Sequence, residues 1–131
     1  MVETSALVAI LLEEPGWLAF AERIDSEPSF TTSVAAFEAT LSLAKHTNLS
    51  ATRAYAAVDA LTTKLRIEVR PVTAPMIALA AEARERFGAG RHGLNMGDCL
   101  SYGAAKFFKT AMLYKGDDFG RTDVNEGFAD L

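Results

Sequence analysis

Apolar residues recur along most of this chain at the spacing of amphipathic helices, and short polar, glycine or proline-containing breaks separate the stretches. In one stretch, Trp17, Phe20 and Ile24 follow one another at intervals of three and four residues, which places them on one helical face. The pattern predicts six helices, namely Ser5–Leu12, Trp17–Ile24, Ser33 to about Lys45, Ser50 to about Leu65, Ala74–Phe87 and Asn95 to about Phe108. The expected N-caps are Thr4 or Ser5, Ser33, Ser50 and Asn95, and Gly88 is the expected C-cap of the fifth helix.

Short β-prone segments lie between these helices. Ile67–Val72 alternates apolar and charged residues, as a half-buried strand does. The other predicted strands are Met1–Glu3, Ser29–Thr32 and Ala111–Tyr114. Strands that alternate with helices predict an α/β fold, with a central parallel sheet covered by helices on both faces. Ligands of such folds bind beyond the carboxyl ends of the strands, where Glu3 and Asp117 are expected to lie.

Composition narrows the class of protein. A chain of 131 residues, half of them apolar, is expected to form one domain with a packed core. No apolar run is long enough to span a bilayer, and Ala6–Leu12 lacks the basic leader of a signal peptide. The single cysteine, Cys99, excludes an internal disulfide and suits a reducing cytoplasm. A net charge of −4 does not favour nucleic-acid binding, although clustered acids would themselves lower the total.

Four acidic residues, remote from one another in sequence, carry the candidate chemistry: Glu3, Glu38, Asp98 and Asp117. If the fold gathers them, they form an oxygen-lined site for a hard divalent cation, of the kind that activates water against phosphodiesters. Glu38 is the most informative, because its neighbours on a helix place it within an apolar stripe. A carboxylate buried there needs a cation or a raised pKa, and an ion pair with Arg or Lys is the alternative explanation.

Each of the other acids also has a structural explanation. Asp98 follows Asn95 by three residues and is placed to complete a helix cap. Asp117 and Asp118 in G-D-D-F are typical of a turn, although one could bind a cation while its neighbour is solvated. Thr4, beside Glu3, is an N-cap candidate whose hydroxyl could instead orient a water molecule.

The segment Gly88–Gly93 matches the pattern G-x-G-x-x-G, but it follows a charged helix instead of a strand. The pattern is therefore explained better by a helix C-cap than by a dinucleotide-binding loop. Arg91 and His92 in this loop are candidates for phosphate contacts, with a solvated loop pair as the alternative.

Four stretches occur together in a specific order and spacing: E-T-S-A-L-V-A-I-L-L-E-E-P, the F-E-A around Glu38, R-H-G-L-N-M-G-D-C-L-S-Y-G-A-A-K and L-Y-K-G-D-D-F-G-R-T-D-V. Through them the whole chain resembles PIN-domain ribonuclease toxins of the VapC type. The resemblance implies one PIN-like domain over residues 1–131, with a three-layer α/β/α sandwich. It implies endoribonuclease activity with Mg²⁺ or Mn²⁺, held by an acidic cluster that maps to Glu3, Glu38, Asp98 and Asp117, beside the hydroxyl of Thr4.

The resemblance also implies a cognate antitoxin that covers the active site, an RNA substrate and a homodimer. The composition predicts a cytoplasmic protein without a membrane partner. The chain departs from the family at Glu3, where D-T-S-A with Asp is most common. Because Mg²⁺ demands octahedral geometry at about 2.1 Å, the extra methylene puts full activity in question.

The predicted mechanism is metal-assisted phosphodiester hydrolysis, with Glu3, Asp98 and Asp117 as ligands and Glu38 as a ligand or water-orienting base. Two alternatives remain. One is a module with a weakened site that binds an antitoxin or RNA without cleaving it. The other is a phosphorelay receiver domain, although that fold needs paired acids after its first strand, and here the pair lies near the other end.

Overall fold

The computed structural model describes residues 1–90 and 93–124. The helices and strands within these ranges are α1 (Thr4–Leu11), α2 (Trp17–Ser26), β1 (Ser29–Thr32), α3 (Ser33–His46), α4 (Ala51–Lys64), β2 (Ile67–Arg70), α5 (Ala74–Phe87) and α6 (Met96–Phe107). All six predicted helices are present, with ends that differ from the predictions by two residues or fewer. Ser50, Asn95 and Gly88 cap their helices as predicted.

Two N-caps were predicted one or two residues too late. Glu3 caps α1, where Thr4 or Ser5 was expected, and Thr32 caps α3, where Ser33 was expected. Glu3 and Thr32 both keep the extended backbone of the strand-like segment before the helix, with ψ of 162° and 157°. Their side-chain oxygens accept from N–H groups of the first turn, so the cap is the last extended residue.

The sheet brings the start of the chain into contact with a segment near residue 113. β1 and β2 pair in parallel, with Ser29 opposite Ile67. Val2 donates its N–H to the carbonyl of Phe30 at 2.8 Å and pairs in parallel with Leu113. The sheet-like order is therefore the Leu113 segment, the Met1–Glu3 segment, β1 and β2. β2 ends at Arg70, two residues before the prediction, because Pro71 has no N–H to continue the ladder.

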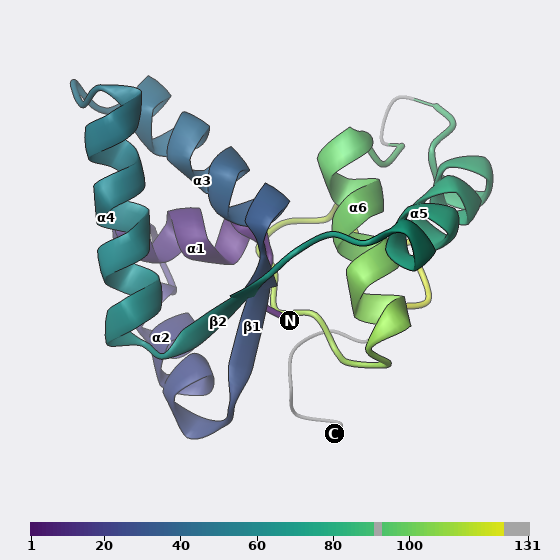
Figure 1. Ribbon diagram of the computed structural model, residues 1–131, viewed down its shortest axis with the longest axis horizontal. Coiled ribbons are helices and arrows are strands. Elements are labelled where there is room, and N and C mark those ends of the chain that lie inside the picture. The colour runs from purple at the N-terminus through teal and green to yellow at the C-terminus, as the bar shows by residue number, and fades with distance from the viewer. Residues whose placement is uncertain (91–92, 125–131) are drawn as a thin grey trace.

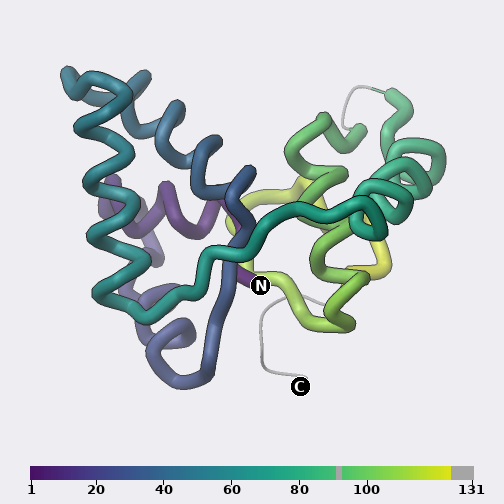
Figure 2. The backbone as a smooth tube through the Cα atoms, viewed as in Figure 1, coloured from purple at the N-terminus to yellow at the C-terminus, as the bar shows by residue number. Residues whose placement is uncertain are grey.

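Helices pack on both sides of these strands. In Figure 1, α1 to α4 lie on one side, and α5 and α6 lie on the other. The chain crosses between the two sides after β2 (Figure 2). Successive strand residues alternate between two hydrophobic clusters: Met1 and Met112 pack in the cluster that contains α5 and α6, and Val2 and Leu113 pack in the cluster of α1 to α4. This alternation is what a sheet covered on both faces requires, and it confirms the predicted α/β class.

The segment after the Leu113 pairing is anchored at Asp123. Its carboxylate accepts from the Tyr102 hydroxyl at 2.7 Å and from Lys106 Nζ at 3.0 Å. The Tyr102 hydrogen bond is the main reason that the pKa of Asp123 falls to about 2. Within the described residues, no helix has the length and apolar character needed to cross a membrane.

Candidate active site

A cleft of about 400 Å³ lies at the carboxyl ends of the strand segments, the edge where parallel sheets bind ligands. It is lined by residues from α1, α3, the first turn of α6 and the turn after Leu113: Glu3, Thr4, Ser5, Val8, Glu14, Glu38, Ser42, His46, Asn95, Asp98, Lys115 and Asp118. Three of the four predicted acids are therefore brought to one cleft, from three separate regions of the sequence.

Glu3 lies at the base of this cleft and is 4% exposed. Its Oε2 accepts from the Ser5 N–H at 2.8 Å and from the Ser5 hydroxyl at 2.5 Å. The Ser5 hydroxyl oxygen in turn accepts from the N–H of Lys115 at 2.8 Å. Burial raises the pKa of Glu3 to about 7 despite the two Ser5 hydrogen bonds, and the negative charges of Asp98 and Glu38 add to the rise.

Glu38 reaches the cleft from α3. Its Oε1 accepts from the Thr4 hydroxyl at 3.3 Å, and the same hydroxyl lies 3.2 Å from the carbonyl oxygen of Ala35. Burial is the main cause that raises the pKa of Glu38; the Thr4 hydrogen bond opposes it and the charge of Asp98 adds to it. Thr4 thus orients the Glu38 carboxylate, whereas the role suggested for its hydroxyl by the sequence was to orient a water molecule.

The sequence argument for burying Glu38 was wrong in its detail. Phe37 and Leu41, two of the apolar neighbours that placed Glu38 in a stripe, are 58% and 49% exposed. α3 instead packs through small residues, including Ala35, Ala36 and Ala39, which allow close approach of its neighbours. Glu38 lies at the edge of that face and is half-buried.

Gly97 makes room for Glu38, and sequence analysis did not identify it. A Cβ atom at Gly97 would overlap all three terminal atoms of Glu38, namely Cδ, Oε1 and Oε2. The absent side chain lets this carboxylate lie against the first turn of α6, where the positive end of the helix dipole favours negative charge. The glycine directly before Asp98 in M-G-D was the signal in the sequence, but only the structure shows what occupies the space.

Asp98 caps its helix, as the sequence suggested, and it also lines the cleft. It closes a capping box with Asn95: its Oδ2 accepts from the Asn95 N–H at 3.1 Å, and its own N–H donates to Asn95 Oδ1 at 2.8 Å. Burial raises the pKa of Asp98, the Asn95 N–H opposes the rise, and the charge of Asp118 adds to it.

The turn after the last strand segment contributes Asp118. Asp118 lines the cleft and raises the pKa of Asp98, as stated above. Asp117 is exposed and is not among the residues that line the cleft, and its carbonyl accepts from the Gly120 N–H at 3.1 Å. The geometry therefore favours Asp118, predicted as an accessory residue, over its neighbour. Arg91 and His92 lie outside the described residues.

The charge of the cleft is largely uncompensated. Of the ion pairs found in residues 1–90 and 93–124, none includes Glu3, Glu38, Asp98 or Asp118. Lys115 extends into the cleft but pairs with Glu14 at 3.5 Å. These observations contradict the alternative in which Glu38 is neutralised by Arg or Lys from the described part of the chain.

The donor set suits a hard cation, because the acidic side chains offer only oxygen atoms and repel one another in their ionised forms. In the part of the chain that the structure describes, no three His, Cys, Asp or Glu side chains are close enough together to hold a metal ion. The acidic residues therefore suit a metal ion by their chemistry and charge, and the raised pKa values of three carboxyl groups support this.

His46 also lines the cleft, although the sequence gave it no role. Glu38, Ser42 and His46 are spaced by four residues, so they share one face of α3. The Nδ1 atom of His46 lies 2.8 Å from the carbonyl oxygen of Ser42. The distance of eight residues from Glu38, two helical steps of four, was the signal that could have identified His46.

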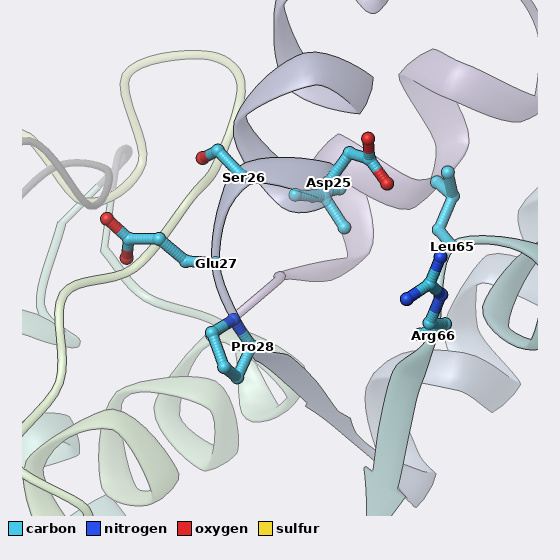
Figure 3. A pocket seen from close by; sticks show the side chains of 7 residues that line it. Asp25, Ser26, Glu27, Pro28, Leu65 and Arg66 are labelled. Atoms are coloured by element: carbon cyan, nitrogen blue, oxygen red, sulfur yellow. The ribbon is translucent and has the colours of Figure 1, made fainter.

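A second hollow, of about 350 Å³, lies at the opposite, amino ends of the strands. Figure 3 shows Asp25, Ser26 and Glu27 around the end of α2 and Pro28 before β1, with Leu65 and Arg66 on the other side of the hollow, just before β2. None of the predicted site residues lines this hollow. Its position is the less usual one for ligands of parallel sheets, so the acidic cleft is the better candidate.

Comparison with known proteins agrees with the predicted fold. The family model described as the PIN domain matches residues 1–125, and the chain belongs to this family. The relatives include a VapC ribonuclease of Mycobacterium bovis, 36% identical over 128 residues that cover 95% of this chain and 94% of the relative. They also include a ribonuclease VapC of Mycolicibacterium smegmatis, 34% identical over 127 residues, which cover 95% of this chain and 96% of the relative. Membership of the PIN-domain family excludes the receiver-domain alternative.

Proposed function

We propose that this protein is a metal-dependent endoribonuclease and the toxin of a toxin–antitoxin pair. The observation that carries the proposal is the cleft that Glu3, Glu38, Asp98 and Asp118 line together, without a salt-bridge partner for any of them in the described residues. Similarity to VapC ribonucleases over almost the whole chain supports the choice of RNA as substrate.

In this mechanism, Glu3, Asp98 and one carboxylate of the Asp117–Asp118 turn hold Mg²⁺ or Mn²⁺, and the lining of the cleft favours Asp118. The bound ion would lower the pKa of a water molecule and offset the charge that develops on the phosphate. Glu38 accepts the proton of the attacking water or serves as a further ligand. Burial raises the pKa of Glu38, which makes its carboxylate a stronger proton acceptor, and Thr4 holds its orientation through Oε1.

The proposal includes the partners that the family resemblance suggests: an antitoxin, an RNA substrate and a second copy of this chain. Exposed apolar side chains on α3 and α4, among them Phe37, Leu41 and Tyr55, support a protein partner on that side. Mixing the purified chain with its candidate antitoxin and measuring both molecular mass and RNA cleavage tests this part directly.

The experiment that tests the proposed site replaces single carboxylates by amides of the same shape. Asp98→Asn retains an oxygen for the helix cap but loses the charge. We therefore expect cleavage of single-stranded RNA to fall at least about 100-fold with little change in the melting temperature. Asp118→Asn is expected to behave similarly, whereas Asp117→Asn serves as the matched control from the same turn.

Metal-dependent cleavage by Asp98→Asn at the wild-type rate would refute the assignment. Loss of activity in Asp117→Asn but not in Asp118→Asn would instead transfer the fourth carboxylate to Asp117. The paramagnetic signal of free Mn²⁺ measures how tightly each variant binds the ion. This measurement distinguishes a variant that no longer binds metal from one that binds metal but lacks the general base.

A second candidate function is a PIN module with a weakened site, which binds an antitoxin or RNA without efficient cleavage. The observation that favours it is the position of Glu3, whose longer side chain bends back to accept two hydrogen bonds from Ser5. Titration with Mn²⁺ followed by an RNA-cleavage assay distinguishes the two functions: an active nuclease shows saturable activity with metal, and a weakened module does not.

A further inference from the structure

A third hollow, of about 360 Å³, adjoins the acidic cleft, and we infer that it binds the nucleotide next to the scissile phosphate of a single-stranded RNA. The inference rests on the proposed function. Six residues line this hollow: Arg86, Phe87, Ala89, Asp118, Arg121 and Thr122. Asp118 also lines the acidic cleft, so the two hollows meet at this side chain. An RNA strand with one phosphate among the carboxylates would continue into this second hollow.

The hollow adds positive charge beside the acidic cleft, where the lining Lys115 is paired with Glu14. Arg121 is exposed, and none of the ion pairs within residues 1–90 and 93–124 includes it. A guanidinium group that is free to reorient suits the oxygen atoms of a phosphate, which it can bind through two parallel N–H groups. In a protein with a net charge of −4, such a group beside an acidic cleft offsets the repulsion of a polyanion.

Arg86 is a second cation of the same hollow, and its charge is only partly neutralised. It lies 3.7 Å from Asp123 Oδ2, an oxygen that also accepts from Lys106 Nζ at 3.0 Å. Asp123 in addition accepts from the Tyr102 hydroxyl at 2.7 Å. One carboxylate is thus shared among three donors, so the side chain of Arg86, which is 54% exposed, keeps positive charge for a ligand.

Phe87 adds an aromatic surface to the two cations. The guanidinium carbon of Arg86 lies 4.7 Å from the centre of the Phe87 ring, so the ring and the cation form one stacked unit. Contact between the Phe87 and Tyr102 rings, with centres 5.7 Å apart, holds the unit in place. Unpaired bases of RNA stack on aromatic rings and on guanidinium planes, and phosphates bind arginine. A hollow with both an aromatic ring and arginine side chains therefore favours a nucleotide over an acidic peptide, which has no base to stack.

The test compares the purified full chain with the variants Arg121→Ala and Arg121→Lys in cleavage of a labelled single-stranded RNA. Because a charge-assisted contact to phosphate is lost, we expect KM to rise about tenfold in Arg121→Ala, with kcat changed less than about twofold. The slope of log(kcat/KM) against log[salt] should become shallower by about 0.7, the value for one phosphate contact on a single strand. Arg121→Lys should recover part of the affinity and the whole salt slope.

The matched control is Arg53→Ala, which removes the same charge from an exposed position in the first turn of α4, on the other side of the molecule (Figure 1). KM should not change in this variant. The subsite is overturned if Arg121→Ala keeps the wild-type KM and salt slope, or if Arg53→Ala loses as much affinity. It is also overturned if Arg121→Ala weakens only the binding of an antitoxin, because the hollow would then be a protein-binding site.

A second variant tests the aromatic surface. Phe87→Leu keeps an apolar side chain against the core but removes the ring, and we expect a several-fold higher KM. The increase in KM should disappear with an RNA from which the base at one position beside the cleavage site has been removed. If Phe87→Leu raises KM equally whichever base is removed, Phe87 does not stack on a base.

RNA binding in an Asp98→Asn background separates failure of this inference from failure of the proposed function. Fluorescence anisotropy reports binding there without cleavage. Weaker binding after Arg121→Ala supports the subsite even if the wild-type chain proves inactive. Unchanged binding overturns the subsite while the nuclease assignment stands on its own assays.

Discussion

Gly97→Ala should separate catalysis from stability, because the space beside Gly97 is filled by a catalytic candidate. A Cβ atom there would lie closer than 3.0 Å to Cδ, Oε1 and Oε2 of Glu38, whereas ordinary van der Waals contacts begin near 3.4 Å. All three atoms belong to the end of a flexible side chain. The overlap is therefore relieved by moving the Glu38 carboxylate out of the cleft by about 1 Å, without unfolding α6.

Gly97→Ala should affect the free energy of unfolding and the reaction rate in opposite ways. Alanine is a better helix former than glycine by up to about 1 kcal/mol, so the free energy of unfolding should stay the same or rise slightly. A displacement of about 1 Å at a catalytic group costs roughly 100-fold in rate, equivalent to about 2.7 kcal/mol of transition-state stabilisation. We therefore expect activity and stability to change in opposite directions.

The assay combines kcat for RNA cleavage with thermal unfolding followed by circular dichroism. Gly120→Ala is the matched control, because a Cβ there would meet only the Asp117 carbonyl oxygen at an ordinary 3.4 Å. Adding Glu38→Asp to Gly97→Ala shortens the displaced side chain by one methylene and should restore part of the lost rate. Gly97→Ala with wild-type kcat would refute the reasoning. A double variant that is no more active than Gly97→Ala alone would refute it as well.

Two further predictions concern Glu3. The pKa of Glu3 in the folded state is about 7, above the ordinary value of 4.5, so folding favours the protonated form. The metal-free protein should therefore lose up to about 3 kcal/mol of stability as pH rises from about 4.5 to about 7. Mg²⁺ should therefore raise the melting temperature more at pH 8 than at pH 5, and an equal increase at both values would contradict this linkage. Glu3→Asp should reach half-maximal activity at a lower Mn²⁺ concentration, because the shorter side chain cannot bend back onto Ser5 in the same way. If this variant instead needs more Mn²⁺, the glutamate is adapted to this site.

Local signals predicted the helices well, because each depends on residues close in sequence. Ser50 accepts from the N–H of Arg53, and Asn95 and Asp98 form a reciprocal cap within one turn. The N-caps at Glu3 and Thr32 were missed because the choice between adjacent polar residues depends on how far the strand-like segment continues. That length is set by pairing with residues elsewhere in the chain, such as Leu113.

The candidate site was predicted in outline but not in detail. Topology alone indicated that the ends of the strands would bring Glu3 close to the G-D-D-F turn. Which of Asp117 and Asp118 faces the cleft depends on the path of an irregular turn, for which the sequence has no periodicity. The role of Gly97 could not be predicted at all, because it consists of space left for a side chain 59 positions earlier in the chain, Glu38.

The Ser5 hydroxyl, which accepts from the Lys115 N–H while it donates to Glu3, has a consequence for biosynthesis. The first acid of the site is held by a serine whose other partner is translated 110 residues later. A nascent chain that has not yet exposed Lys115 and Asp118 outside the ribosome lacks one wall of the cleft. The cleft therefore cannot assemble before the segment that contains Lys115 and Asp118 has left the ribosome.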